Sequence, residues 1–471
     1  MLRLPALLLL SCVTTVAQDV TFVDRTEELK IAPANGAACW ADLNNDGWSD
    51  LVAGSIWKNN EGQSFTKVGD VGVCVAADFD NDGRVDLFSW SGLKLLRNEG
   101  DFQFEAVELP ELPKTVSRGA CWGDFNRDGF VDLLIGGYED WNAGITWPFI
   151  VLLNNKGESF SIAATESRLR TRGVTACDFD RDGDTDVYLS NYRLQPNQLF
   201  VSDGKGGFED QAKLRNALAT SPGFGGGHSI GSAWGDFNSD GHIDLFAGNF
   251  AHQDGRGDQP KSRFLQNMGP DKEYRFEDRG PGGVHYQESY ATPAAGDYDN
   301  DGNLDVFFTT VYGVASFGRK NNPVLFRGQG DFTVTNANAS AKIPALPPTY
   351  QAAWVDYDND GDLDLTSAGK LFENQGTAHS WLRVRLRGDG TKVNRSAIGA
   401  QVRIAAGNRT HTRQVEAGTG EGNQNDLTLH FGLGDYRDPV SLEVFWTDGT
   451  VQTVAGVAVE TTVEVAYHKN Q

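Results

Sequence analysis

The sequence is poor in the residues that build helical, zinc-dependent or nucleic-acid-binding proteins. It has 2 Met and 8 scattered His in 471 residues, and it lacks the HExxH, CxxC and phosphate-loop motifs, which argues against catalytic zinc. Runs with helical periodicity are scarce, and no segment after residue 17 is apolar enough to cross a membrane. The formal net charge of −23 argues against nucleic acid as a partner.

The N-terminus and the cysteines indicate an exported protein. Residues 1–17 combine one basic residue, a short apolar run and small residues near Ala17, which is typical of a signal peptide. We therefore expect a secreted, extracellular or periplasmic protein, with a lipid anchor at Cys12 as the open alternative. Each remaining cysteine lies in a short apolar stretch before an Asp-rich turn, so we expect buried thiols rather than disulfides at Cys39, Cys74, Cys121 and Cys177.

What the sequence has in abundance is glycine, at 55 residues, and short apolar runs bounded by Gly, Asn and Asp, which favours an all-β fold. One nonapeptide recurs seven times, with starts 36 to 61 residues apart. The copies are DLNNDGWSD at 42, DFDNDGRVD at 78, DFNRDGFVD at 124, DFDRDGDTD at 178, DFNSDGHID at 236, DYDNDGNLD at 297 and DYDNDGDLD at 356. Apolar runs flank each copy and a Gly turn follows, so each unit predicts the four strands of a propeller blade.

The ends of the repeat array predict how it closes. The seventh unit stops at KLFENQG without a final strand, and the N-terminal VTFVDRTEEL resembles the missing strand. We therefore expect a seven-bladed β-propeller over residues 18–378, with the N-terminal strand closing the last blade. Alternating apolar residues after it predict a small β-sandwich over residues 379–471.

The motif D-x-[DN]-x-D-G-x-x-D predicts a cation site in every repeat. Side-chain oxygens recur at positions 1, 3, 5 and 9, position 7 offers its backbone carbonyl, and Gly at position 6 permits a sharp turn. This set suits Ca²⁺ better than Mg²⁺, and the absence of Glu at position 12 excludes the helix–loop–helix calcium motif. Without cations the like charges would repel one another, whereas seven divalent ions would change the net charge from −23 to −9.

We expect up to seven structural calcium ions. The predicted ligands are Asp42, Asn44, Asp46, Trp48 and Asp50; Asp78, Asp80, Asp82, Arg84 and Asp86; Asp124, Asn126, Asp128, Phe130 and Asp132; Asp178, Asp180, Asp182, Asp184 and Asp186; Asp236, Asn238, Asp240, His242 and Asp244; Asp297, Asp299, Asp301, Asn303 and Asp305; and Asp356, Asp358, Asp360, Asp362 and Asp364.

Two resemblances follow from these motifs. The seven copies resemble FG-GAP/VCBS repeats over residues 19–376, which implies calcium-bearing blades like those of integrin α-subunits. NRSAIGAQV, HFGLG and the Trp before DGTVQ resemble the ASPIC/UnbV domain, although Thr447 replaces the usual Pro and GTGEGNQ is more polar than usual. Together they resemble the cartilage acidic protein family and its bacterial relatives, which implies a secreted calcium-binding extracellular protein.

Ligand binding is predicted on the side of the propeller opposite the acidic turns. Loops and blade connections there carry Tyr138, Trp141 and Tyr312 and a predicted set comprising Arg118, Arg172, His228, Tyr290, Tyr350, Tyr192 and Arg193. A cationic mouth in an acidic protein favours an extracellular binding or adhesion module for an anionic glycan or a protein. A polysaccharide lyase or other sugar-modifying enzyme at the channel mouth is the alternative, a purely structural scaffold is a third possibility, and the oligomeric state stays open.

Overall fold

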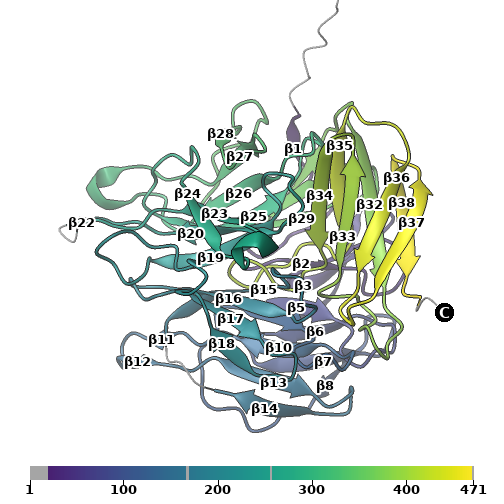
Figure 1. Cartoon of the computed structure of the whole chain (residues 1–471), viewed down its shortest axis with the longest axis horizontal. Coiled ribbons are helices and arrows are strands. Elements are labelled where there is room, and N and C mark those ends of the chain that lie inside the picture. Colours follow the sequence, from purple (N-terminus) through teal and green to yellow (C-terminus); the bar gives the residue numbers. More distant parts are fainter. Residues whose placement is uncertain (1–19, 166–168, 255–256, 469–471) are drawn as a thin grey trace, which may run out of the picture.

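The computed structural model describes residues 20–165, 169–254 and 257–468, and the described chain is built from β-strands (Figure 1). In these ranges the helical segments are two short 3₁₀ turns, η1 (Pro270–Lys272) and η2 (Ser316–Gly318). None of the helices in the described part is long and apolar enough to span a membrane. The predicted signal peptide and the alternative lipid site at Cys12 lie outside the described residues.

The repeat region forms seven antiparallel sheets in the described chain. The first four are β2 (Cys39–Ala41), β3 (Asp50–Asn59) and β4 (Phe65–Gly72); β5 (Cys74–Ala77), β6 (Asp86–Ser89), β7 (Lys94–Asn98) and β8 (Phe104–Val107); β9 (Ala120–Gly123), β10 (Asp132–Ile135), β13 (Ile150–Asn154) and β14 (Phe160–Ala164); and β15 (Thr171–Cys177), β16 (Asp186–Asn191), β17 (Gln198–Ser202) and β18 (Phe208–Asp210).

The remaining three sheets follow the same order along the chain. They are β19 (Ser229–Gly235), β20 (Asp244–Asn249), β23 (Arg263–Asn267) and β24 (Phe276–Gly280); β25 (Tyr290–Gly296), β26 (Asp305–Thr310), β27 (Val324–Gly328) and β28 (Val334–Asn336); and β29 (Ala353–Val355), β30 (Asp364–Ser367), β31 (Lys370–Asn374) and β1 (Phe22–Asp24). Two small hairpins extend the loops of the third and fifth sheets, β11 (Glu139–Asp140) with β12 (Ile145–Thr146) and β21 (Gln253–Asp254) with β22 (Gly257–Asp258).

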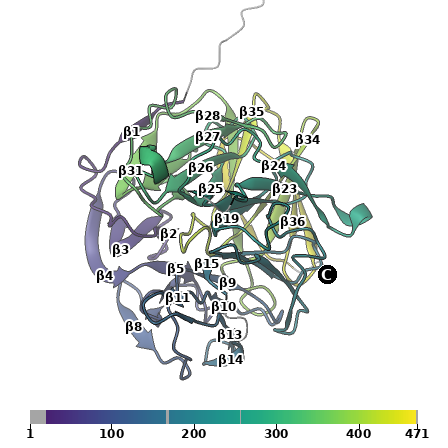
Figure 2. The same cartoon turned by 90° about the vertical axis from the view of Figure 1, so that its left-hand side faces the viewer.

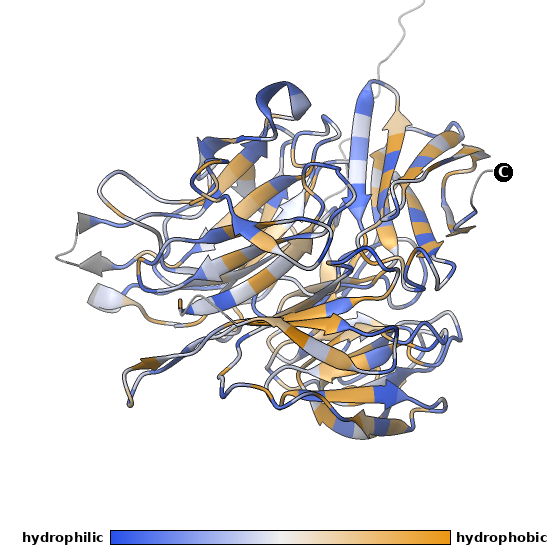
Figure 3. Cartoon of the chain, turned by 60° about the horizontal axis from the view of Figure 1, so that its bottom comes forward, coloured by the Kyte–Doolittle hydropathy of each residue, from blue (hydrophilic) through white to orange (hydrophobic). Residues whose placement is uncertain are grey.

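The acidic motif sets the boundaries of the strands. In every repeat the second strand begins at the ninth residue of the motif, as at Asp50 and Asp86, so the acidic turn connects the first two strands. The first strands are mostly buried, and several are largely apolar, as in CWA of β2 and ACWG of β9. Figure 3 shows apolar residues gathered on the strands and polar residues on the turns between them. The sheets therefore pack through their strands, and the turns lie at their ends.

The N-terminal strand lies in the last sheet, as its sequence predicts. β1 pairs antiparallel with β31, with Phe22 opposite Asn374, although the two strands are more than 300 residues apart in the chain. The first and last sheets also share an apolar cluster, in which Phe65 contacts the rings of Trp40 and Tyr357 at centroid distances of 6.0 Å. Contacts among first strands run from β2 through β5, β9, β15, β19 and β25 to β29, and β29 contacts β2.

The C-terminal segment folds into two sheets, and the strands of both are drawn in colours from yellow-green to yellow in Figure 1. One contains β35 (Leu429–Gly434), β32 (Ser380–Arg387) and β38 (Thr461–Ala466), and the other β34 (Arg409–Gln414), β33 (Gln401–Ala406), β36 (Val440–Phe445) and β37 (Val451–Val457). Alternate residues of β36 are buried, including Leu442 and Val444, and they share a core with Leu382 and Val384 of β32. Two sheets with a common apolar core match the predicted sandwich.

One loop of the C-terminal segment enters the centre of the repeat region. We call residues 416–426 the central segment; Figure 2 shows it between β2, β15 and β19. Its backbone bonds to first strands of different sheets: Trp122 N to Ala417 O (2.9 Å), Gly420 N to Ser232 O (3.3 Å), Trp40 N to Gln424 O (3.2 Å) and Asp426 N to Trp354 O (3.1 Å). The polar GTGEGNQ sequence therefore supplies hydrogen-bond partners to strands that face the centre.

Candidate metal centres

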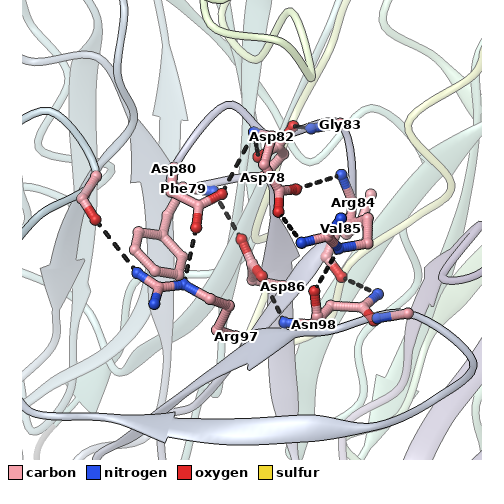
Figure 4. Close-up of polar contacts among 12 residues, drawn as sticks. Asp78, Phe79, Asp80, Asp82, Gly83, Arg84, Val85, Asp86, Arg97 and Asn98 are labelled. Atoms are coloured by element: carbon pink, nitrogen blue, oxygen red, sulfur yellow. Dashed lines mark hydrogen bonds and ion pairs between the residues drawn. The ribbon is translucent and has the colours of Figure 1, made fainter.

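The turn at residues 78–86 illustrates how the motif folds (Figure 4). Asp78 accepts hydrogen bonds from the backbone N–H groups of Asp82 (3.1 Å) and Gly83 (2.7 Å). Asp86 accepts one from the N–H of Phe79 at 3.0 Å. Gly83 has a φ of 93°, in the left-handed region that other residues adopt only with strain. Asp86 also accepts a hydrogen bond from the N–H of Asn98 at 2.8 Å, so the first and last aspartates fix the turn through both of their carboxylate oxygens. Each carboxylate oxygen has a second lone pair that can bind a ligand.

The same backbone bonds recur around the molecule. In all seven turns the N–H of the sixth residue donates to the first aspartate, at 2.7–3.1 Å. In all seven the N–H of the seventh residue donates to the fifth, at 2.8–3.0 Å. The predicted ligand positions therefore have one shared geometry, although their chain spacings vary.

Carboxylate oxygens converge on one point in four turns. Three such oxygens lie within 4.8 Å of one another in the sets Asp78, Asp80 and Asp86; Asp178, Asp180 and Asp186; Asp297, Asp299 and Asp305; and Asp356, Asp358 and Asp360. The other three turns have Asn at the third position, where the amide offers a neutral oxygen: Asn44, Asn126 and Asn238.

Several of these oxygens are buried and have no hydrogen-bond partner in the described chain. They include Oδ1 of Asp178, Asp180, Asp297, Asp299 and Asp358 and Oδ2 of Asp186. A buried carboxylate oxygen without a partner is costly, whereas a bound cation satisfies several at once. The residues therefore fit a cation, and all-oxygen ligands in a flexible turn suit Ca²⁺.

Without a cation, the electrostatics of these sets of turn carboxylates, called cages below, would oppose ionisation. Burial raises the pKa of Asp50 and of Asp86 to about 8, although backbone hydrogen bonds act in the opposite direction. For Asp178 and Asp297, burial and then neighbouring carboxylates hold the pKa well above its usual value. A divalent cation would remove this penalty and keep the carboxylates ionised at neutral pH.

Neighbouring turns are connected to one another through their fourth residues. All seven fourth residues have φ between 54° and 59°. Where this residue is Asn, its Nδ2 donates to the carbonyl of the glycine in the next turn: Asn45 to Gly83 (2.8 Å), Asn81 to Gly129 (2.9 Å), Asn300 to Gly361 (3.3 Å) and Asn359 to Gly47 (3.3 Å). The last of these bonds runs from the seventh turn back to the first.

The three other junctions use longer side chains. Arg127 pairs with Asp184 at 3.1 Å, and Arg181 donates to the carbonyl of Gly241. Ser239 is short, and Arg409 of the C-terminal segment bridges the gap by donating to Ser239 Oγ and to the carbonyl of Gly302, both at 2.9 Å. Each turn is therefore joined to the next, once with help from the C-terminal segment.

Sequence reasoning missed that the C-terminal segment packs against the acidic turns. Arg383 Nη1 lies 2.9 Å from Asp356 Oδ2, Thr412 N donates to Asp236 at 3.1 Å, and Arg395 N donates to Asn81 Oδ1 at 2.7 Å. No local signal pairs these residues, because each contact joins segments more than 20 residues apart and most join segments more than 150 apart. The turns therefore contribute to an interface as well as to the cages.

The predicted ligand residues lie partly together. Arg172 is buried, and its guanidinium lies 5.4 Å from the ring of Tyr192 and 5.0 Å from that of Tyr350. The ring of His228 is 4.8 Å from Tyr192, and Arg118 lies 5.5 Å from the ring of Tyr138, which also contacts Arg172.

Two further residues of the predicted set differ in their position: Tyr290 lies elsewhere, whereas Arg193 lies 5.9 Å from the ring of Tyr192. Tyr290 stacks on Phe308 at 4.3 Å in a separate apolar cluster, and Arg193 lies 3.9 Å above the ring of exposed Trp141. Of the seven residues, Tyr290 is therefore the one that the fold separates from the rest.

The centre of the predicted mouth holds a residue that the sequence did not indicate. Glu421 of the central segment accepts two hydrogen bonds from Arg172 Nη2, at 2.8 and 3.0 Å, and both residues are buried. Burial raises the pKa of Glu421, and Arg172 opposes this shift. The charge of Arg172 is therefore already matched within the chain. Arg193 Nε also pairs with Glu139 Oε1 at 2.8 Å, so Arg118 is the predicted arginine without an ion pair among the described residues.

Comparisons with known proteins agree with this architecture. The FG-GAP-like repeat family matches residues 78–135, 178–247 and 297–367, and the ASPIC and UnbV family matches residues 390–471. Cartilage acidic protein 1 of Mus musculus is 30% identical over 313 residues, covering 64% of this chain and 46% of the relative. The Homo sapiens protein of that name is 28% identical over 312 residues, covering 64% and 44%.

The chain therefore spans less than half the length of the curated relatives that it matches. A solved structure of an Agrocybe aegerita lectin, described as recognising non-reducing terminal N-acetylglucosamine, matches with a TM-score of 0.43 and 15% identity, covering 65% of this chain and 80% of the lectin. The chain therefore contains FG-GAP-like repeats followed by an ASPIC and UnbV domain, and it is similar to cartilage acidic protein 1.

Proposed function

We propose that the chain is a secreted, calcium-stabilised β-propeller that acts as an extracellular binding module for an anionic glycan or a protein. The proposal that the chain binds calcium rests on one observation. Buried carboxylate oxygens without hydrogen-bond partners lie close together in turns that share one repeated geometry. Calcium bound there would neutralise the cages and stabilise the fold rather than take part in a reaction.

The proposed architecture is a closed ring of seven blades over residues 18–378, followed by a domain over residues 379–471. Three observations support closure: β1 completes the last sheet, β29 contacts β2, and the bonds between turns return from Asn359 to Gly47. Closure would leave no unpaired sheet edge between the first and last blades.

Metal content gives a direct test of the proposed cages. The purified chain, dialysed against calcium and analysed by plasma emission spectrometry, should retain up to seven ions. Excess chelator should lower its melting temperature by more than about 10 °C, because each occupied site stabilises only the folded state. An unchanged melting curve after verified metal loss would contradict the assignment. Magnesium at equal concentration is the control, since it suits these ligands less well.

The proposed ligand surface lies around Arg118 and Arg193, on loops away from the acidic turns. Trp141, 67% exposed, and Tyr312, 56% exposed, add aromatic surface to it. Exposed aromatics beside guanidinium groups suit an acidic sugar or an acidic protein surface.

A panel of acidic polysaccharides tests this surface. The wild-type chain should be retained, and the Arg118→Ala/Arg193→Ala variant should bind about tenfold more weakly than an Arg279→Ala control. Equal binding by both variants would contradict the proposed surface. New unsaturated or reducing ends in the polysaccharide would instead indicate an enzyme.

A further inference from the structure

A cavity of about 370 Å³ lies between the first two acidic turns and the C-terminal domain. Three guanidinium groups of that domain line it, from Arg385 and Arg387 on β32 and from Arg395 in the following loop. On the other side are Asp42 and Asp78, the first residues of their turns; the latter turn appears in Figure 4. The volume suits a ligand of about the size of one sugar unit.

The three arginines have few partners in the described chain. Arg385 Nη1 is 3.8 Å from Asp42 Oδ2, at the long limit for an ion pair. The buried Nε of Arg395 has no hydrogen-bond partner, and exposed Arg387 has no carboxylate within 4.0 Å among the described residues. Three guanidinium groups with so little pairing are unusual in a chain of net charge −23, where carboxylates are in excess.

The acidic groups around the cavity are mostly committed elsewhere. Asp42 and Asp78 accept hydrogen bonds from Gly47 and Gly83 and belong to the proposed calcium cages. Asp426 accepts hydrogen bonds from Ser49 Oγ and from the backbone of Thr428. With calcium in the two turns, Glu464 is the remaining uncompensated carboxylate on the wall, against three arginines.

A hydroxyl group completes the set of donors. Ser396 Oγ accepts a hydrogen bond from the N–H of Asp78 at 3.1 Å, so its own proton is free to be donated into the cavity. Guanidinium groups and a hydroxyl together match the oxygens of a carboxylate or a sulfate.

We propose that this cavity binds an oxyanion, the carboxylate or sulfate group of an acidic sugar, and that it does so only when the first two turns hold calcium. The inference rests on the proposed calcium occupancy, because without it Asp42 and Asp78 would repel the anion. The site would lie on the side of the acidic turns, apart from the surface around Arg118 and Arg193, and it would link ligand binding to calcium.

Calorimetric titration of the full calcium-loaded chain tests the site with three probes: sodium glucuronate, sodium sulfate and, as a neutral control, glucose. Glucuronate should bind and glucose should not, while sulfate binding would show that the oxyanion alone is sufficient. Arg387→Gln should weaken glucuronate binding about tenfold, and Arg437→Gln, an exposed guanidinium of the same domain outside the cavity, should leave it unchanged. Because Arg387 is exposed and without a carboxylate partner, its substitution should not impair folding.

Two outcomes would overturn the inference: no glucuronate binding by the calcium-loaded chain, or equal binding by the Arg387 and wild-type chains. Glucuronate binding that persists undiminished in chelator would also contradict it, since the proposed site requires calcium. Metal analysis of the same samples separates the two proposals. Retained calcium without glucuronate binding overturns only the cavity, whereas absence of calcium overturns the proposed cages.

Discussion

At the scale of single residues, the ion pair between Arg172 and Glu421 connects the two parts of the chain. Both side chains are buried, and the residues are 249 positions apart. A buried pair adds little net stability compared with apolar groups of similar shape, but removing one partner leaves an uncompensated charge. The pair therefore acts mainly to fix where the central segment lies.

This view predicts the outcome of a double-mutant cycle. Glu421→Gln should lower the free energy of unfolding by about 3 kcal/mol, because Arg172 stays buried without a counter-charge. Arg172→Met alone should cost a similar amount, and the double variant should cost clearly less than the sum. Denaturant unfolding in calcium buffer measures all three. Strictly additive effects would mean that the two side chains do not interact.

At the scale of elements, the acidic turn combines a cage with a junction to its neighbour. Its first, fifth and ninth residues hold the local backbone, while its fourth residue reaches the next turn. These roles use different residues of one nonapeptide. A cation bound in one turn would therefore also hold in place the glycine carbonyl to which the preceding turn donates a hydrogen bond. The ring of turns would thus respond to calcium as a connected set.

The turns predict how stability depends on pH. Burial raises the pKa of Asp50 and of Asp86 to about 8 and that of Asp78 to about 7 in the metal-free fold, above the value of 3.8 for an unperturbed Asp. A raised folded-state pKa stabilises the fold at low pH, and this contribution is lost as pH rises through it. Metal-free chain should therefore become less stable between about pH 4 and pH 8.

Calcium should reverse this trend, because it favours the ionised carboxylates and competes with protons. The difference in melting temperature between calcium-loaded and metal-free chain should be largest near pH 8 and should shrink toward pH 5. Differential scanning calorimetry at several pH values measures it. A difference that is constant with pH would contradict the assignment of these carboxylates as ligands.

At the scale of the whole molecule, the C-terminal domain is an internal support of the repeat region. The central segment supplies acceptors to N–H groups on the innermost strands, including those of Trp40, Ala76 and Trp122. It also accepts a hydrogen bond from the indole of Trp90 through Gly422 O at 3.1 Å. Without this segment these donors would face the centre of the repeat region without their present partners.

Removing the domain should therefore weaken the repeat region. A chain of residues 18–378 should melt at least about 10 °C below the full chain in calcium, since each buried donor left unsatisfied costs about 1–3 kcal/mol. Gln424→Ala in the full chain should lower the melting temperature by a smaller amount. It removes only the two hydrogen bonds from the Gln424 side chain to N and O of Ala76, at 2.8 and 3.1 Å. Equal melting temperatures for all three chains would contradict a supporting role.

Features that depend on neighbouring residues could be predicted from the sequence. The acidic turns lie between the expected strands, and β1 pairs with β31, because the nonapeptides and the missing final strand are local patterns. The thiols of Cys39 and Cys121 are free and buried, which follows from their apolar surroundings. By contrast, the predicted ligand set included Tyr290, which packs on Phe308, and omitted Glu421, because neither contact has a local signature.

By itself the sequence determined the repeated unit: Asp spacing within nine residues specifies the turn, and flanking apolar runs specify its strands. Only the tertiary structure decided which face the C-terminal domain covers and which residue meets Arg172 at the centre. The physical reason is how far apart in the sequence the interacting residues lie. Turn geometry and strand burial follow from adjacent residues, whereas a buried charge is matched by whichever distant segment the fold brings beside it.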